Sequence, residues 1–329
     1  MEQASEPPYL TYSRYLHERH GCTVYRVAVD AGFSCPNRAS GRAGAGCTYC
    51  AEDGSRAPYL APLPPPGDER CAQTLAEQVG QAIGFLRRRY AAEAFILFFQ
   101  AFSNTNAPVA VLRRVYDEGL DLAPFRGLSV ATRPDCIDAE KADLLGSYRD
   151  RGLDVWVELG LQTAHDATLE RIGRGHTVGQ FLGAYQVLKA RGIKVAVHLI
   201  FGLPGESLPQ LVETIRFVAS LKPDGVKIHN LHVPAGTVLA REYAMGEIAP
   251  PGAHTHIEYV IAAIERLPPQ TVIMRLLCET PEDRLLAPRS FPVKQRFTSQ
   301  LAAAMRERGA FQGRLYEDPD ADLRSPGKA

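Results

Sequence analysis

Short apolar segments alternate with amphipathic helical segments along most of this 329-residue chain. The runs at 95–99 and 195–197 are apolar without alternation, which is typical of strands that are covered on both faces. A repeated order of strand and helix predicts parallel strands joined by right-handed crossovers. We therefore predict an α/β fold, a partial (β/α)6 TIM-like barrel with a C-terminal α/β extension.

Local signals place the elements of this barrel. Asp138 and Thr177 are suited to N-cap two helices, and Gly152 and Gly192 follow where helices end. The predicted strands cover 23–31, 94–100, 127–132, 155–161, 195–201 and 225–231, and the predicted helices cover 74–90, 109–120, 138–151, 178–191 and 208–221. The proline-rich stretch 54–73 is predicted to be a loop.

The regular pattern loosens after residue 231. We predict a helix near 256–267, a strand at 271–276 and a helix near 292–308. The predicted domains are the barrel with its cysteine loop at 1–236, an extension packed on the barrel at 237–315, and a disordered tail at 316–329.

The composition excludes several classes of protein. The 37 basic and 37 acidic side chains cancel, so there is no global charge that would attract nucleic acid or a membrane. No apolar run approaches the roughly 18 residues of a membrane helix, and the N-terminus does not resemble a signal peptide. We expect a cytoplasmic protein with no membrane partner. The cysteines Cys22, Cys71, Cys136 and Cys278 are far apart, so we expect neither a disulfide scaffold nor a second metal cluster.

Three further cysteines stand in a loop after the first predicted strand. Cys35 is followed by Cys47 and Cys50, and Tyr49 lies between the last two. Three thiolates can bind an iron–sulfur cluster while leaving one iron without a protein ligand, and that iron can bind a small molecule. A zinc knuckle, with His20 or Cys22 as a fourth ligand, and buried thiols without any ligand are the alternatives.

The spacing of these cysteines resembles that of the radical SAM superfamily. In that superfamily two residues separate the last two cysteines, and the second of these residues is aromatic. The first gap is most often three residues and is eleven here; long first gaps occur in branches related to the catalytic subunit of Elongator. The resemblance implies that Cys35, Cys47 and Cys50 bind a [4Fe–4S] cluster. It also implies that Tyr49 lies against the adenine of S-adenosylmethionine.

Polar residues follow the second and third predicted strands, where such barrels carry their chemistry. The acid that holds the methionine amino group in much of the superfamily is missing. Gln100, Ser103 or backbone carbonyls can replace it, unless this polar group only caps a turn. The stretch around Thr132 and Arg133 resembles an Elongator-type segment, with Ala131 where a glutamate is common. Thr132 and Arg133 are therefore candidates for the cofactor pocket, and a surface salt bridge is the alternative for Arg133.

The segments 157–163 and 171–177 resemble those that contact the cofactor in Elongator-type and coproporphyrinogen-dehydrogenase-type proteins. Gln162 and Arg174 occupy the matching positions. Glu158 shares a strand face with Gln162 and needs a partner if it is buried. We predict that Arg133 or Arg174 is this partner, in a pair that serves either the cofactor or the structure alone.

Three histidines follow on the fifth and sixth strands. His198 stands where the porphyrinogen branch has an aspartate, which implies a contact with the cofactor ribose. His229 and His232 lie on opposite faces of the sixth strand. Either one can line a substrate cavity, or both can be hydrogen-bonded in the core.

Motifs from about residue 32 to residue 236 thus resemble a branch of radical SAM proteins close to the Elongator catalytic subunit. The resemblance implies reductive cleavage of S-adenosylmethionine at a [4Fe–4S] cluster, with tRNA nucleoside modification as the expected use of the 5′-deoxyadenosyl radical. It also implies an electron donor such as flavodoxin or ferredoxin. The alternatives are oxidation of a small metabolite or tetrapyrrole, and a metal-stabilised binding protein without catalysis. Basic clusters at 14–20 and 87–89 can bind phosphates or merely complement helix ends.

Overall fold

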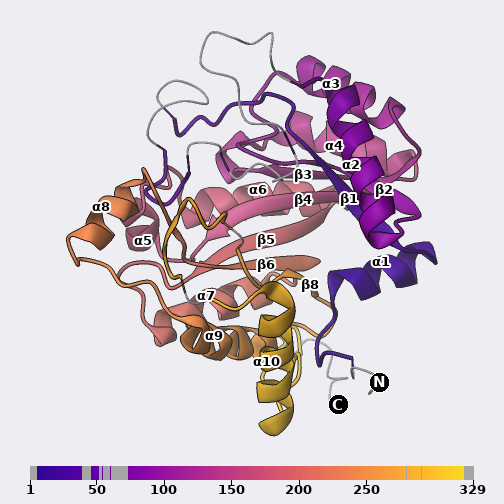
Figure 1. Cartoon of the computed structure of the whole chain (residues 1–329). Helices are drawn as coiled ribbons and strands as arrows, with labels where there is room; N and C mark the ends of the chain where they lie inside the picture. Colours follow the sequence, from indigo (N-terminus) through magenta and orange to yellow (C-terminus); the bar gives the residue numbers. More distant parts are fainter. Residues whose placement is uncertain are drawn as a thin grey trace, which may run out of the picture.

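Seven parallel strands form one curled sheet in the computed structural model (Figure 1). The structure describes residues 6–38, 46–51, 54, 60, 73–278, 280–289 and 291–321. In spatial order, the strands are β1 (Val24–Val29), β2 (Ala94–Phe99), β3 (Phe125–Thr132), β4 (Asp154–Gln162), β5 (Lys194–Phe201), β6 (Gly225–Asn230) and β8 (Val272–Arg275). The predicted partial barrel and its six strands are confirmed. The sheet has one strand more than predicted, because β8 joins it beside β6.

The helices follow the predicted alternation, with three additions. They are α1 (Tyr12–His20), α2 (Leu75–Tyr90), α3 (Val109–Asp121), α4 (Ala139–Asp150), α5 (Asp166–Arg171), α6 (Val178–Ala190), α7 (Leu208–Ser220), α8 (Val238–Ala244), α9 (Ala253–Arg266) and α10 (Lys294–Glu307). The predicted caps are confirmed, since Asp138 accepts from the Lys141 N–H and Thr177 from the Gln180 N–H. Helices α1, α5 and α8 were not predicted from the sequence. The small antiparallel pair of β7 (Val233–Pro234) and β9 (Leu285–Ala287) was not predicted either.

The two faces of the sheet have different roles. On β4, Val157 and Leu159 point toward the outer helices, where they join the main apolar core. Trp156, Glu158 and Gln162 belong to the opposite, concave face because side chains alternate along a strand. All nine residues of β4 are buried, as expected for a strand that is covered on both faces. The concave face is therefore the place where polar side chains can gather.

An apolar layer closes the end of the barrel where the strands begin. Tyr12 and Tyr15 of α1 pack edge-on against Trp156, with ring centroids 6.0 and 5.4 Å away. Ile96 and Ala196 belong to the same buried cluster. Because α1 seals this end, the concave face is left for chemistry nearer the ends of the strands.

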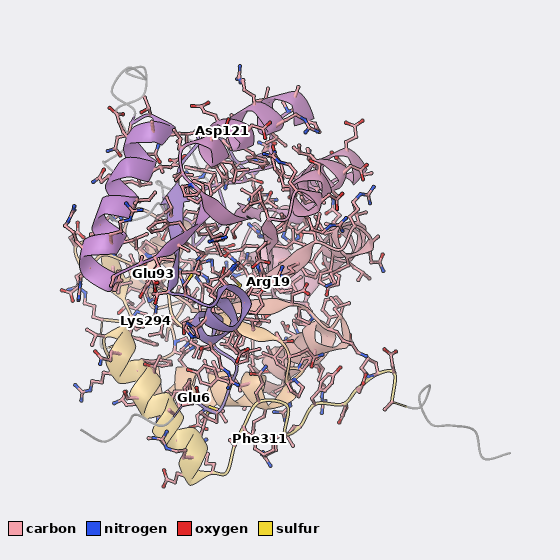
Figure 2. The ribbon with its side chains drawn as sticks, turned by 90° about the vertical axis from the view of Figure 1, so that its right-hand side faces the viewer. Glu6, Arg19, Glu93, Asp121, Lys294 and Phe311 are labelled. Atoms are coloured by element: carbon pink, nitrogen blue, oxygen red, sulfur yellow. The ribbon has the colours of Figure 1, made fainter. Side chains whose placement is uncertain are left out.

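The terminal segments of the described chain are held together. The Leu10 N–H donates to Gln312 Oε1 at 2.8 Å, and Lys222 contacts Asp318 and Asp320 at 2.6 Å each. Residues 316–321 of the predicted tail are thus anchored on the end of α7, and 322–329 lie outside the described residues, as does most of the predicted loop 54–73. Arg19 of α1 and Lys294 of α10 lie on the same side of the molecule (Figure 2). No helix among the described residues is long and apolar enough to cross a membrane.

The close approach of β3 and β4 at Gly127 leads to a testable prediction. A Cβ atom on this buried glycine would lie 2.5 Å from the carbonyl oxygen of Asp154, its partner on β4. We expect Gly127→Ala to lower the free energy of unfolding by about 1–3 kcal/mol, because the strands must shift apart. Urea denaturation of the purified protein measures this change.

The matched control is Gly183→Ala on the exposed face of α6. Nothing lies within 4 Å of a Cβ atom there. We expect this change to stabilise the helix by up to ~1 kcal/mol, since alanine is the better helix former. Equal effects of the two substitutions would contradict the close β3–β4 approach.

Candidate functional site

The three predicted ligand cysteines line one cavity at the carboxyl ends of the strands. The cavity has a volume of about 160 Å³ and is lined by Cys35, Cys47 and Cys50. The ends of β3 and β4 contribute Thr132 and Gln162. The structure therefore brings together residues that are more than 100 positions apart, at the end of the barrel opposite α1.

Donors surround the sulfur atoms of this cavity. Asn37 Nδ2 donates to Cys47 Sγ at 3.3 Å, Arg38 Nη2 to Cys50 Sγ at 3.1 Å and Arg174 Nη1 to Cys47 Sγ at 3.7 Å. Burial alone would raise the pKa of the Cys47 thiol, but Arg174 holds this pKa below its usual value. Burial raises the pKa of Cys50, which Arg38 opposes. Clustered thiols with cationic donors fit an iron–sulfur cluster, because hydrogen bonds to sulfur stabilise its thiolate ligands.

The zinc alternative is not supported by the described residues. His20 and Cys22 precede β1, whereas Cys35 follows it. A strand of six residues spans roughly 20 Å, so neither side chain can complete a site with the three cysteines. No group of three His, Cys, Asp or Glu side chains among the described residues could hold a single metal ion. A cluster differs in this respect, since each thiolate binds a different iron. The described cysteines are free thiols.

Arg174 reaches the cysteines through a turn after α5. Its Nη2 donates to the carbonyl oxygen of Gly160 at 3.0 Å and its Nε donates to His176 Nε2 at 3.0 Å. A Cβ atom at position 160 would lie 2.4 Å from Arg174 Nη2, so a side chain there would displace this guanidinium. The side chain is thus held at the cysteine cavity by β4 and by the turn together.

Non-glycine residues with left-handed backbone occur beside the cavity. Gln162 has a φ of 79° where β4 ends, and Ala101 and Phe102 have φ values of 71° and 56° after β2. This conformation costs roughly 1–2 kcal/mol for a residue with a side chain, and such costs are often found at ligand sites. The Gln162 side chain lines the cavity and has no hydrogen bond to any described residue. It is therefore available to a ligand.

The other predicted cofactor residues are placed differently. The Thr132 hydroxyl lies 2.9 Å from Ser103 Oγ and 2.6 Å from Thr105 Oγ1, so Ser103 belongs to a buried polar cluster. Arg133 pairs with Asp135 at 2.8 Å. This arginine is only 3% exposed, so its salt bridge is not a surface one, and its Nη1 has no partner among the described residues. Both Thr132 and Arg133 line the cysteine cavity.

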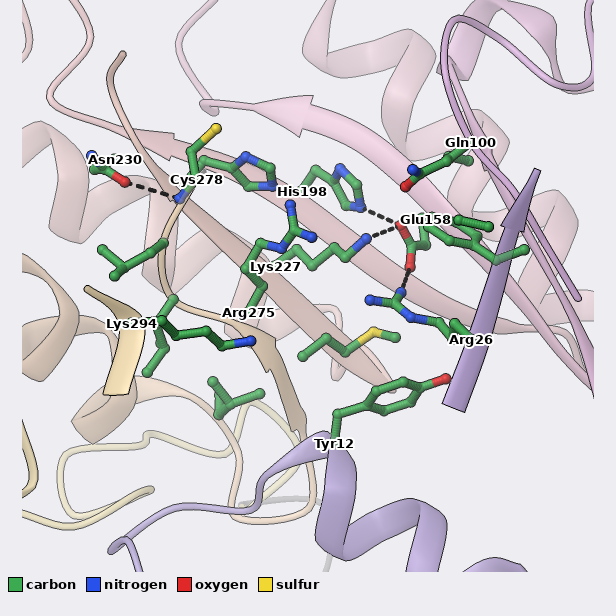
Figure 3. A pocket seen from close by; sticks show the side chains of 18 of the residues that line it. Tyr12, Arg26, Gln100, Glu158, His198, Lys227, Asn230, Arg275, Cys278 and Lys294 are labelled. Atoms are coloured by element: carbon green, nitrogen blue, oxygen red, sulfur yellow. Dashed lines mark hydrogen bonds and ion pairs between the residues drawn. The ribbon is translucent and has the colours of Figure 1, made fainter. Parts of the chain in front are cut away.

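A second, larger cavity continues from the first along the concave face. It has a volume of about 1370 Å³ and extends to α1 and α10 (Figure 3). Tyr49, Cys50, Gln162 and His198 line both cavities. Gln100, the remaining cofactor candidate, lines the larger one. A ligand at the cysteines would thus face a space large enough for a further molecule, since typical ligand pockets measure roughly 300–1,000 Å³.

One carboxylate lies at the centre of this concave face. Glu158 Oε1 accepts from Arg26 Nη1 at 2.5 Å, and Oε2 accepts from His198 Nε2 at 3.0 Å and from the Lys227 ammonium (Figure 3). The predicted pairing with Arg133 or Arg174 is wrong. Arg174 contacts Gly160, two residues farther along β4, and so lies one layer above Glu158.

The protonation states follow from these contacts. Burial alone would raise the pKa of Glu158, but Lys227, Arg26 and His198 hold it well below the ordinary value. Burial and Lys227 lower the pKa of His198 to about 4, and burial lowers that of His229 well below its usual range. At neutral pH the site therefore contains an ionised Glu158 and two neutral histidines.

Sequence reasoning missed several residues of the larger cavity. Arg26, Lys227 and Arg275 line it, and their positions on β1, β6 and β8 alternate with core residues as any inward-facing side chain would. His229 and His232 both line it, and His232 Nδ1 also forms a hydrogen bond with Thr280 Oγ1 at 2.8 Å. Of the basic side chains at 14–20 and 87–89, His17 alone is among the described residues that line the large cavity.

Comparisons with known proteins agree with this geometry. Residues 35–218 match the model of the radical SAM superfamily, and residues 223–307 match that of the radical SAM C-terminal domain. The chain is 33% identical to YtqA of Bacillus subtilis strain 168 over 315 residues, which cover 95% of this chain and 94% of YtqA. It is 36% identical to YhcC of Escherichia coli strain K12 over 276 residues, covering 83% of this chain and 84% of YhcC.

More distant similarities cover part of the chain. A Methanocaldococcus jannaschii protein named tRNA uridine(34) acetyltransferase is 36% identical over 145 residues, or 43% of this chain and 26% of that protein. The structure of Elp3 from Methanocaldococcus infernus superposes with a TM-score of 0.63 at 22% identity. It covers 72% of this chain and 60% of that one, and at this identity it shows a shared fold.

Because Cys35, Cys47 and Cys50 line one cavity, we predict that cluster assembly needs all three thiols. Changing Cys35, Cys47 or Cys50 singly to alanine should abolish cluster assembly, because the remaining two thiolates leave a second iron without a protein ligand. Iron and sulfide content and visible absorbance after anaerobic reconstitution measure the result. Cys22→Ala and Cys278→Ala should retain the cluster. Loss of the cluster in Cys22→Ala would show that the assignment of three ligands is wrong.

The charge network predicts a large effect of neutralising Glu158. Glu158→Gln keeps the shape but leaves Arg26 and Lys227 without a counter-charge, so we expect a loss of about 3–5 kcal/mol in unfolding free energy. Chemical denaturation measures it. His198→Gln, which removes a hydrogen bond from a neutral ring, should cost less, about 1–3 kcal/mol. Adding Lys227→Met to Glu158→Gln should restore part of the loss, and no recovery would contradict the proposed charge balance.

Proposed function

The chain belongs to the radical SAM superfamily, and from that membership we propose an enzyme that modifies a nucleoside of tRNA. The superfamily implies a [4Fe–4S] cluster and S-adenosylmethionine. The continuity of the cysteine cavity with the large cavity on the concave face carries the proposal. It offers one place for the cofactors and an adjoining place for a substrate.

The residues present fit both cofactors. Cys35, Cys47 and Cys50 would hold the cluster with one iron open. Gln162 and Tyr49 line both cavities and would hold S-adenosylmethionine between the cluster and the substrate space. Bound there, S-adenosylmethionine supplies on one-electron reduction a 5′-deoxyadenosyl radical, which can take a hydrogen atom from carbon.

The chain's own groups prepare this space in three ways. Arg174 and Arg38 donate to the sulfurs and stabilise thiolate charge. The apolar cluster of α1 with Trp156 packs the end of the barrel at which the strands begin. The Glu158 network fixes the walls from three strands, so that a substrate meets a rigid surface.

The proposal of a tRNA substrate is supported by partial similarity. The archaeal relative that matches 43% of this chain is named a tRNA uridine(34) acetyltransferase. Its matched part corresponds to 26% of that protein, so the reaction on this chain need not be the same. We include a one-electron donor, flavodoxin or ferredoxin, in the same proposal because the cluster must be reduced for each cleavage.

The test begins with anaerobic reconstitution with iron and sulfide. Dithionite and S-adenosylmethionine are then added, and 5′-deoxyadenosine is quantified with and without unmodified tRNA. We expect formation that requires Cys47 and that rises when tRNA is present. Cys47→Ala is the matched inactive control.

Two outcomes would contradict the proposal at different levels. A fully loaded cluster that yields no 5′-deoxyadenosine under any condition would favour a binding protein without radical chemistry. Formation that is indifferent to tRNA would favour a small-molecule substrate instead.

A further inference from the structure

Cations greatly outnumber acids in the large cavity. Its lining contains Arg26, Lys227, Arg275, Arg284, Lys294 and Arg306. Glu158 is the one acidic side chain in this lining, as far as the described residues go. The whole chain has equal numbers of basic and acidic side chains, so this concentration of positive charge is local.

Glu158 cannot balance these cations, because it is already fully engaged. Its two oxygens accept from Arg26, His198 and Lys227. The guanidinium of Arg26 is always charged and by itself neutralises Glu158. Lys227 shares this carboxylate with Arg26, and Arg275 has no acidic partner among the described residues of the lining.

The positive charge of Arg275 affects the pKa values of two neighbouring side chains, Lys227 and His229. Burial, Arg26 and Arg275 lower the pKa of Lys227 well below its ordinary value, even though Glu158 acts in the opposite direction. After burial, Arg275 is the main cause that lowers the pKa of His229. A protein surface with this pattern disfavours a further positive charge and favours a negative one.

Arg275 is placed to meet a negative charge. It ends β8, and its guanidinium points into the cavity toward Lys227 (Figure 3). It forms neither a hydrogen bond nor an ion pair with a described residue. The buried His229 Nε2, which lies near Arg275, also has no partner in the described chain.

Arg275 is half-buried and lines the cavity, so its unpaired guanidinium is accessible to a ligand there. A planar guanidinium with five N–H donors matches the two oxygens of a phosphate or a carboxylate. Lys294 is exposed and lines the same cavity, so it can attract such a group from solvent (Figure 3). The carboxylate of S-adenosylmethionine is a poor match, because Arg275 does not line the cysteine cavity where that cofactor would be anchored.

We propose that the substrate carries an oxyanion, a phosphate or a carboxylate, which Arg275 binds in the large cavity with His229 as a further polar contact. This inference rests on the proposed function in that it specifies the substrate of the same site. It would make Arg275 a specificity-determining residue that selects negatively charged substrates.

Arginine footprinting tests the inference without turnover. The reconstituted full-length protein, saturated with S-adenosylmethionine, is treated with phenylglyoxal, and modification of Arg275 is followed by peptide mass spectrometry. The competitors are inorganic phosphate, acetate, uridine 5′-monophosphate and uridine, at an ionic strength kept constant with potassium chloride. Arg216, exposed on α7, serves as the internal control.

We expect phosphate or acetate to slow the modification of Arg275 and to leave Arg216 unchanged. Protection by phosphate and the nucleotide alone assigns a phosphate, and protection by acetate alone assigns a carboxylate. Protection by uridine equal to that by its monophosphate, or no protection by any competitor, would overturn the inference. No reductant or tRNA is used, so failure of radical chemistry leaves this result unaffected.

A binding experiment tests the same inference independently. It also applies if phenylglyoxal does not modify Arg275. Equilibrium dialysis compares the protective anion on the wild type, Arg275→Gln, Arg275→Lys and the control Arg216→Gln. Loss of a charge-assisted hydrogen bond should weaken binding about tenfold or more in Arg275→Gln. Arg275→Lys should lie between, and Arg216→Gln should match the wild type. Unchanged binding by Arg275→Gln, with normal iron content, would also overturn the inference.

Discussion

The interior of this partial barrel depends on one buried carboxylate. The Glu158 side chain is 0% exposed and binds groups from β1, β5 and β6. An unpaired charge in such a place would cost several kcal/mol, so the sheet is stable only if its curvature brings the cations to the carboxylate. A closed barrel fills its interior with layers of apolar side chains. Here an ionic layer replaces one of them and holds the curled strands together around an open space.

The strand that carries Glu158 also divides the barrel into levels. Trp156 lies in the apolar seal with α1, and Glu158 lies in the ionic layer. Gly160 receives Arg174 beside the cysteines, and Gln162 faces both cavities. The first three levels are two residues apart, as the strand period requires, and a register shift separates Gly160 from Gln162. The distance from the sealed end to the cysteines is thus set by a single strand, which places any cofactor at the carboxyl ends.

Sequence reasoning succeeded where the signal was local and failed where it depended on distant residues. The strands, the caps at Asp138 and Thr177 and the three cysteines each have a pattern within a few positions. The partners of Glu158 do not, since Arg26 is 132 positions away and Lys227 is 69. The left-handed Ala101 and Phe102 could not be foreseen either, because neither is glycine. The strand β8 was expected, but its membership of the main sheet depends on pairing with β6.

The ionic layer and the proposed substrate charge are linked through Lys227. Burial and the charges of Arg26 and Arg275 lower the pKa of Lys227, although Glu158 acts in the opposite direction. An oxyanion on Arg275 would cancel that repulsion and raise the pKa of Lys227. By linkage, protonation of Lys227 and binding of the oxyanion favour each other. A neutral substrate would gain nothing from this coupling. The residues that stabilise the barrel would therefore also give it the proposed preference for an anion.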